Sequence, residues 1–418
     1  MPYSLFGNKF SKHSGITELM DDLNAGVKGG DDILMLGGGN PATIPKLNER
    51  FTELMATLLE QGKLIDTLAN YDGPKGKDAF IAALVEMFND LYNWNLTAEN
   101  IMLTNGSQSA FFYLFNLLSG EFDNGRKKKI LFPLAPEYIG YADASLSEDT
   151  FIGVKPRITE LDNQQFKYNV DFDALEIGDD IGAICVSRPT NPTGNVLTDQ
   201  EIEKLDRLAK SHNIPLIIDN AYGTPFPNII FEDVKPHFND NTILCLSLSK
   251  FGLPGARCGI VIANTEITKA MSNLSGIMAL SPGGIGPEIA LPLVKNKEII
   301  KISNDIIKPF YYEKSQRAIK LLTEKIPNSN FRIHKSEGAL FLWLWFKDLP
   351  ISSHELYKRL KEKGLIVVSG HYFFPGLDNE WQHIHECLRL NYAQADDVVE
   401  RGVDILADVV NELYSTSI

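Results

Sequence analysis

Residues 242–259 read TILCLSLSKFGLPGARCG, an apolar run that opens into small polar residues, glycines and a proline. The run 242–246 is typical of a buried strand, and the glycines and proline behind it predict a turn. Lys250 therefore follows the end of a strand, the place where α/β folds bind ligands. A lysine held away from water there has a lowered pKa, and its amine can form an imine with an aldehyde. The alternative interpretation is a solvated loop lysine.

The alternation of strand, turn and helix from about residue 100 predicts an α/β fold with a parallel sheet covered by helices. We expect strands at 101–104, 129–133, 181–187, 214–218 and 242–246. We expect helices at 47–62, 77–91, 110–118 and 199–212. Just past the carboxyl ends of the successive strands lie Gly106, Tyr138, Asn191, Asp219 and Lys250.

Several of these residues have both a structural and a functional interpretation. The residues from Gly106 through Ser107 and Gln108 precede an apolar helix, so they either cap it or present its N-terminal amides to an anion. Tyr138 either packs in the core or stacks on a flat ring. Asp219 ends an apolar strand and needs a partner, because an unpaired buried carboxylate is costly.

Two further stretches join these candidates. Ser247, Ser249 and Arg257 carry groups that suit a phosphate. The glycine run 37–39 either lets the backbone approach a ligand closely or forms a hinge, and the sequence leaves both possibilities open.

Composition narrows the function classes. The chain has 418 residues, 44% of them hydrophobic, and a net charge of −14, which opposes binding to nucleic acid. Four scattered cysteines predict buried thiols in a reducing compartment. Residues 1–10 lack the apolar segment of a signal peptide, and the longest hydrophobic run, 339–346, is too short to span a bilayer. We therefore expect a soluble cytoplasmic protein.

Four motifs in this order resemble the class I/II aminotransferases of fold type I: Asn191-Pro192-Thr193-Gly194, the segment 219–222, the Ser-x-Ser-Lys-x-Gly-x-x-Gly-x-Arg-x-Gly of 247–259, and Cys387-Leu388-Arg389-Leu390-Asn391-Tyr392. The motifs extend over nearly the whole chain. The resemblance implies a three-layer sandwich with a mostly parallel central sheet and a smaller α/β domain. The large domain would be 48–300, and the small domain would combine 1–47 with 301–418.

The resemblance also implies pyridoxal 5′-phosphate as the cofactor and amino acids and 2-oxo acids as substrates. Lys250 would form the imine with the cofactor and move the proton at the substrate Cα. Asp219 would pair with the pyridine nitrogen, Asn191 and Tyr222 would bond the 3′-oxygen, and Tyr138 would stack on the ring. The phosphate would be held by Gly106, Ser107, Gln108, Ser247, Ser249 and Arg257.

For the substrate, the resemblance implies that Arg389 binds the α-carboxylate as a bidentate fork, with Gly39 and Asn191 beside it. Tyr71 would reach the phosphate of the neighbouring subunit's cofactor, so a homodimer with shared active sites is expected. Arg188 departs from many relatives, and its role stays open.

The substrate is expected to be a small aliphatic amino acid, with valine and alanine, or their oxo acids, as the pair. Aspartate-specific relatives use a second arginine from the neighbouring subunit. Here the corresponding region 273–280 is apolar, and residues 270–294 contain no Lys or Arg. A side-chain carboxylate would be desolvated there without a partner.

Three alternatives accompany this interpretation. Another reaction on the same cofactor, such as β-elimination or decarboxylation, would use the same residues. A cofactor-binding sensor fused to a DNA-binding domain would need more residues before the glycine run and a basic surface. His383, His385 and Glu386 could hold a metal, although packing near Arg389 explains them as well. Trp343 and Trp345 are expected in the core.

Overall fold

The computed structural model describes residues 2–12, 14–17, 20–21 and 33–416. Its central sheet has eight strands in the order β2-β11-β10-β9-β8-β4-β3, with β5 beside β4. The pairs β4–β8, β8–β9 and β9–β10 are parallel, whereas β11 is antiparallel to both of its neighbours. The strands are β2 Ile101–Asn105, β3 Gly120–Glu121, β4 Lys127–Phe132, β5 Phe151–Gly153, β8 Ile181–Ser187, β9 Leu216–Asp219, β10 Thr242–Ser247 and β11 Cys258–Ile262. The predicted α/β class with a mostly parallel sheet is confirmed.

In the described part of the chain, the four predicted helices are found within about three residues of their expected bounds, and three helices that the sequence analysis did not predict also pack around this sheet. α7 shows why: its first turn is a capping box in which Thr198 and Glu201 bond each other's backbone amides, and Ile202 and Leu205 turn to the core. These helices are α3 Pro45–Glu60, α4 Lys63–Ala69, α5 Asp78–Tyr92, α6 Ser107–Leu118, α7 Asp199–Ser211, α8 Thr265–Ala279 and α9 Ile285–Lys295.

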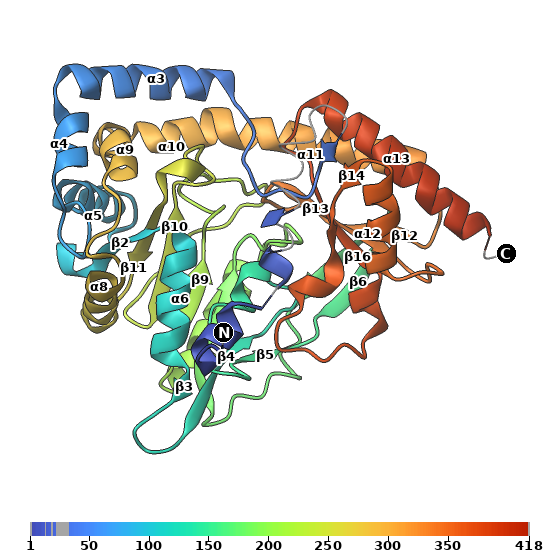
Figure 1. Cartoon of the computed structure of the whole chain (residues 1–418), viewed down its shortest axis with the longest axis horizontal. Helices are drawn as coiled ribbons and strands as arrows, with labels where there is room; N and C mark the ends of the chain where they lie inside the picture. The colour runs from blue at the N-terminus through green and yellow to red at the C-terminus, as the bar shows by residue number, and fades with distance from the viewer. Residues whose placement is uncertain (1, 13, 18–19, 22–32, 417–418) are drawn as a thin grey trace.

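A second sheet, with strand order β15-β16-β13-β12-β7-β6, is built mainly by the C-terminal part of the chain, which Figure 1 shows in orange and red. Its strands are β6 Arg157–Leu161, β7 Gln165–Asn169, β12 Phe331–His334, β13 Phe341–Phe346, β15 Val368–Ser369 and β16 Cys387–Asn391. The hairpin β6–β7 comes from the middle of the chain and joins this sheet through β12. The division into 48–300 and the two flanking segments stays a prediction.

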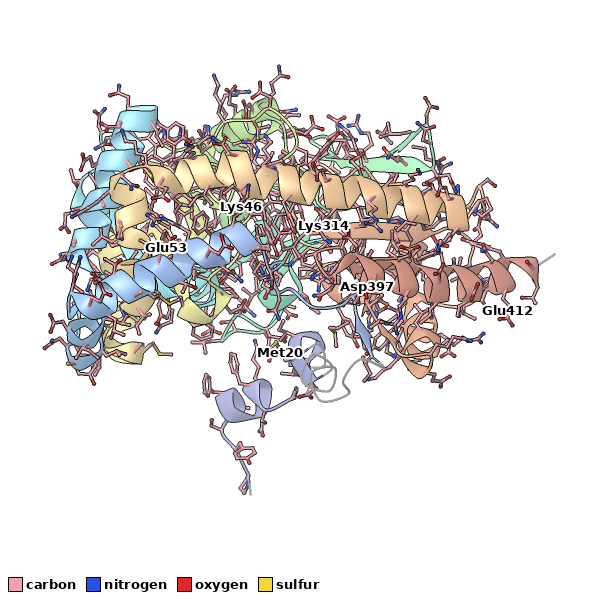
Figure 2. All side chains as sticks on the ribbon, turned by 90° about the horizontal axis from the view of Figure 1, so that it is seen from above. Met20, Lys46, Glu53, Lys314, Asp397 and Glu412 are labelled. Carbon is pink, nitrogen blue, oxygen red and sulfur yellow. The ribbon has the colours of Figure 1, made fainter. Side chains whose placement is uncertain are left out.

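Residues near the start of the main described segment pair with the C-terminal part of the chain in a separate two-stranded sheet. β1 (Leu34–Met35) pairs in parallel with β14 (Leu365–Ile366). α11 (Lys308–Lys325) and α13 (Asp396–Ser415) lie side by side in Figure 2, joined by the ion pair of Lys314 with Asp396. The short helix α1 (Leu5–Phe10) lies at the edge of the body, where Lys9 donates to the Ser147 carbonyl over 2.5 Å and the ring of Phe10 lies 6.2 Å from that of Phe112. The remaining helices of this part are α10 Glu298–Ile302 and α12 Ser353–Glu362.

Packing explains the aromatic and histidine residues of the second sheet. Trp343 and Trp345 are buried on β13, as expected. His383 is buried among aromatic rings, and this burial lowers its pKa to about 3. His385 contacts the Asn379 carbonyl, and Glu386 accepts a hydrogen bond from the Trp345 indole. The three candidate metal ligands therefore contact separate partners.

All four cysteines are buried free thiols, as predicted. Among the described residues, no helix is both long and apolar enough to cross a membrane.

Candidate active site

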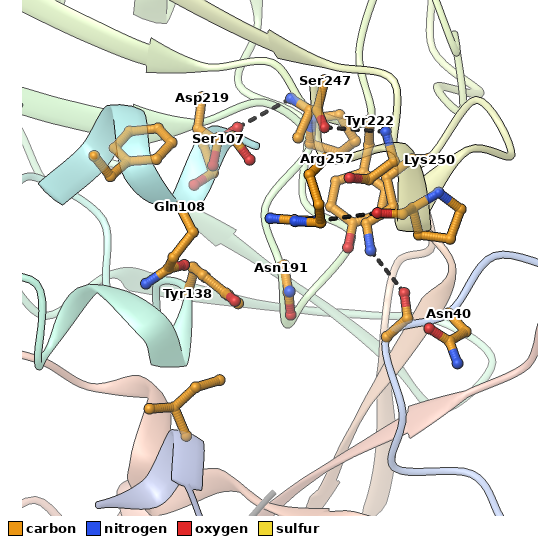
Figure 3. Close-up of a pocket in the computed structure, with 18 of the residues that line it drawn as sticks. Asn40, Ser107, Gln108, Tyr138, Asn191, Asp219, Tyr222, Ser247, Lys250 and Arg257 are labelled. Atoms are coloured by element: carbon orange, nitrogen blue, oxygen red, sulfur yellow. Dashed lines mark hydrogen bonds between the residues drawn. The ribbon is translucent and has the colours of Figure 1, made fainter. Parts of the chain in front are cut away.

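A cavity of about 250 Å³ opens at the carboxyl ends of the parallel strands (Figure 3). It brings together nearly all of the predicted site residues from segments far apart in the chain. Those that line it are Gly39, Ser107, Gln108, Tyr138, Asn191, Asp219, Tyr222, Ser247, Ser249, Lys250, Arg257 and Arg389. Gly106 caps the helix that begins at Ser107, whereas Tyr71 lies elsewhere.

Lys250 lies in the turn behind β10 and points into the cavity. Its Nζ donates to the Gly39 carbonyl over 2.6 Å and lies 5.3 Å from the centre of the Tyr222 ring. Burial lowers the pKa of Lys250 to about 8, and the nearby guanidinium groups of Arg389 and Arg257 act in the same direction. A large fraction of the amine is therefore neutral near pH 8, the form that can act as a base or nucleophile.

The glycine run 37–39 is tied to the site at each of its carbonyl oxygens. Gly37 accepts from Arg389 over 2.6 Å, and Gly38 accepts from Asn391 over 2.6 Å. Gly39 accepts from Lys250. Of the two possibilities left open by the sequence, these contacts favour a backbone segment that approaches a ligand.

Arg389 is a buried cation at one end of the cavity, with 1% of its surface exposed. One terminal nitrogen donates to the Asn191 side-chain oxygen over 2.8 Å, and the guanidinium carbon lies 4.1 Å from the centre of the Phe341 ring. Its Nε is buried without a hydrogen-bond partner, and no carboxylate in the described part of the chain forms an ion pair with it. Burial lowers the pKa of Arg389 to about 10. A buried cation without an anion is costly, so this end of the cavity is suited to a carboxylate ligand.

The other end of the cavity is built for an anion. The twelve-residue α6 points its N-terminus there, behind Gly106 at φ 81°. A Cβ at Gly106 would lie 2.0 Å from Nη2 of Arg257, so the glycine makes room for the guanidinium beside the helix N-terminus. The Gln108 side chain donates to the Gly140 carbonyl. The backbone amide of Gln108 lies in the first turn of α6, where backbone N–H groups have no partner within the helix and suit an anion.

Asp219 ends β9, and the structure supplies partners for it. Its Oδ2 accepts from the Tyr141 hydroxyl over 2.6 Å, and Oδ1 accepts from the Ala221 amide over 3.0 Å. Burial raises the pKa of Asp219 above its ordinary value, and the two hydrogen bonds offset part of this rise. Sequence reasoning missed Tyr141 and the two residues behind it, Ser187 and Glu137. The available signal was position, because Glu137 precedes Tyr138 and Tyr141 follows it by one turn.

Comparison with known proteins places the chain in a family. The model of the family "Aminotransferase class I and II" matches residues 32–406. The chain belongs to this family. It is 54% identical to the valine–pyruvate aminotransferase of Escherichia coli K12 over 417 residues, covering 100% of both chains.

Solved structures of aminotransferases agree with this assignment. A putative amino-acid aminotransferase from Psychrobacter arcticum superposes with a TM-score of 0.96 at 50% identity, covering 99% of both chains. The valine–pyruvate aminotransferase of Salmonella typhimurium superposes with a TM-score of 0.88 at 53% identity, covering 96% of this chain and 100% of that chain.

Arg188 of this aminotransferase has structural partners. It is buried and donates to the Leu197 carbonyl over 2.6 Å, to the Lys235 carbonyl over 2.9 Å and to Asp199 over 2.6 Å. It is absent from the cavity wall, although its neighbours on both sides line it. We therefore assign it to holding the turn that carries Asn191.

Two expected elements lie outside the cavity of their own chain. Tyr71 is 83% exposed. Residues 273–280 lie at the end of α8, away from the residues that line the cavity. In their place, Ile16 and Met20 line the cavity, two apolar residues that sequence reasoning did not single out.

Proposed function

We propose that this aminotransferase binds pyridoxal 5′-phosphate in the cavity, with Lys250 as its covalent anchor. The residues fit the group: the phosphate would lie between the α6 N-terminus and Arg257, in the space that Gly106 leaves open. Ser247 and Ser249 line the same end. Tyr138 would cover one face of the ring. When bound, the cofactor supplies an electron sink for the pair left at the substrate Cα.

The protein's own groups would then orient and move protons. Asp219 would hold a proton on the pyridine nitrogen as an ion pair. The Tyr222 hydroxyl and the Asn191 amide nitrogen would donate to the ring oxygen, because the Asn191 oxygen already accepts from Arg389. Lys250, whose pKa is about 8, would take the proton from the substrate Cα and return it at the cofactor carbon.

The observation that carries the proposal is the buried Arg389, which forms no ion pair with any described residue and faces the same cavity as Lys250. A substrate α-carboxylate would neutralise this guanidinium. Fixing the carboxylate in this way favours transamination over decarboxylation on the same cofactor.

We further propose that the substrates are small and aliphatic, with valine and pyruvate converted to 3-methyl-2-oxobutanoate and alanine. Ile16 and Met20 offer an apolar wall for an isopropyl group, whose burial contributes on the order of 1.5–3 kcal/mol. Arg188, which lies between two residues of the cavity wall, is engaged with Asp199 and offers no partner to a side-chain carboxylate. The identity of 54% to a valine–pyruvate aminotransferase supports the same pair.

A homodimer with shared sites forms part of the proposal. Apolar side chains around the loop of Tyr71 and at the end of α8 are 61–83% exposed. The loop and the helix end form one surface, because a Cβ on Gly276 of α8 would lie 3.5 Å from Pro74 in the loop. Burial of this patch by a second copy would be favourable. Its members are Leu68, Tyr71, Ile277, Met278 and Leu280. We propose a cytoplasmic location, which the free thiols favour.

The test is a panel of amino acids mixed singly with the cofactor-loaded enzyme, followed by the absorbance of the cofactor, with oxo-acid products identified by mass spectrometry. We expect the second-order rate constant of this half-reaction to be highest for valine and alanine. A higher value for aspartate or glutamate would refute the substrate class. Release of carbon dioxide, or of free ammonia together with an oxo acid, would indicate a lyase, because transamination keeps the amino nitrogen on the cofactor.

A further inference from the structure

Next to Asp219, three polar side chains form a buried series of contacts that reaches the cavity wall at Ser187. Tyr141 donates to Asp219 over 2.6 Å, and its oxygen lies 3.3 Å from the Ser187 hydroxyl. Ser187 in turn contacts Glu137, with its hydroxyl 2.5 Å from Oε2 and its backbone amide 3.0 Å from Oε1. Glu137 is 1% exposed and no cation in the described residues forms an ion pair with it.

The number of available protons determines which group donates in each of these hydrogen bonds. The Tyr141 hydroxyl donates its one proton to Asp219, so toward Ser187 it can only act as an acceptor. The Ser187 hydroxyl also has one proton and cannot donate to both Tyr141 and Glu137. All contacts are satisfied only when Glu137 carries a proton and donates it to Ser187. If Glu137 is ionised, Ser187 turns to it, and the oxygens of Ser187 and Tyr141 face each other without a hydrogen.

We propose that Tyr141, Ser187 and a protonated Glu137 are positioning residues for Asp219, forming a relay that delivers a hydrogen-bond donor to its Oδ2 and keeps this carboxylate ionised and aimed into the cavity. The inference rests on the proposed function, because the purpose of an ionised Asp219 is to pair with the pyridine nitrogen. Burial raises the pKa of Glu137 to about 8, which agrees with the proton on it. The titratable groups facing the relay are Tyr138 beside Glu137, Cys185 on β8, Cys245 on β10 and Lys250 on the cavity side of Asp219.

The decisive experiment titrates Asp219 by carbon NMR in the cofactor-free full-length protein, labelled at aspartate carboxyls, with Asp219→Asn used to assign the signal. Tyr141→Phe removes the donor but keeps a ring that stacks on Phe132. We expect it to lower the acid dissociation constant of Asp219 about tenfold or more. Tyr414→Phe is the matched control, because its hydroxyl donates one bond to the Lys347 carbonyl far from the site and its loss should leave Asp219 unchanged.

The variant Glu137→Gln tests whether Glu137 is protonated and donates to Ser187. A glutamine amide donates to Ser187 at every pH, so the Asp219 signal should lose a step near pH 8 that the wild type shows. Two results would overturn the relay. One is an acid dissociation constant of Asp219 in Tyr141→Phe that lies within twofold of the wild-type value. The other is a change of the Asp219 signal near pH 8 that persists in Glu137→Gln.

Cofactor binding separates this inference from the proposed function. We expect Tyr141→Phe to bind pyridoxal phosphate about 10- to 100-fold more weakly than wild type and Tyr414→Phe. Wild-type protein that fails to bind pyridoxal phosphate would refute the proposed function, and the titration without cofactor would still decide the relay. Normal binding by wild type together with an unaltered titration in Tyr141→Phe would refute the relay alone.

Discussion

Lys250 and Gly39 are joined by a hydrogen bond of 2.6 Å between the amine and the carbonyl oxygen, although 211 residues separate them in the chain. This contact brings the amine to the glycine run that also holds Arg389, so the proposed proton-transfer group and the proposed carboxylate-binding group share one backbone segment.

The depressed pKa of Lys250 predicts its reactivity. A lysine whose pKa falls from 10.5 to about 8 is protonated and unreactive below pH 8 and becomes a free amine above it. In the cofactor-free protein, the rate of acetylation of Lys250, measured by mass spectrometry, should therefore rise to half its maximum near pH 8. The exposed Lys320 serves as the internal standard. A midpoint for Lys250 above pH 10 would contradict the desolvated amine.

Arg389 and Arg188 are both buried, yet their replacement should have different consequences. Arg389→Lys keeps a charge but loses the fork, so kcat/KM for valine should fall roughly 10- to 100-fold, mainly through KM. Arg188→Lys should leave KM unchanged and lower the free energy of unfolding by about 1–3 kcal/mol, because backbone carbonyls of Leu197 and Lys235 lose a donor. Steady-state kinetics and denaturant unfolding of both variants check this, and an equal rise in KM would show that Arg188 contacts substrate.

Gly106→Ala should weaken phosphate binding. The new methyl group would lie 2.0 Å from Arg257 Nη2 and push the guanidinium away from the helix N-terminus. Gly125→Ala is the matched control, since its φ of 73° is similar to the 81° of Gly106 but nothing lies within 4 Å of its Cβ. Both variants should lose about 1 kcal/mol of stability from the positive φ. Only Gly106→Ala should show a weaker affinity for pyridoxal phosphate in fluorescence titration, and equal affinities would remove Arg257 from the phosphate site.

Shared active sites predict the behaviour of hybrid dimers. In a hybrid of one Lys250→Ala subunit and one Tyr71→Phe subunit, the site that keeps Lys250 receives an intact Tyr71 from its partner. That site should be wild type, so purified hybrids should show about half of the wild-type activity per dimer. The Tyr71→Phe parent tests the role of the hydroxyl, and hybrids no better than the average of the parents would show that Tyr71 serves its own subunit.

Local sequence was sufficient for the strands and helices that build the site. The strand at 181–187 was predicted with its observed bounds, and most of the others were within about three residues, because an apolar run of five to seven residues closed by glycine or proline is a local signal. The placement of Asn191, Asp219 and Lys250 behind strand ends followed from the same signal, since parallel strands all end at one edge of the sheet.

The contacts between distant segments were decided only in three dimensions. β11 (Cys258–Ile262) inserts antiparallel between β2 and β10, and the hairpin β6–β7 leaves its neighbours in sequence to join the second sheet. Neither pairing changes the local spacing of apolar residues, so the sequence pattern could not predict which strands would pair.

The contacts of Asp219 with its relay, and the position of Ile16 in the cavity wall, are likewise decided only by the tertiary structure. The sequence determined that Asp219 needs a partner, because a buried carboxylate is costly at the end of any apolar strand. The tertiary structure decided that the partner is Tyr141, because hydrogen-bond geometry depends on how the segment after β4 packs across the end of β9.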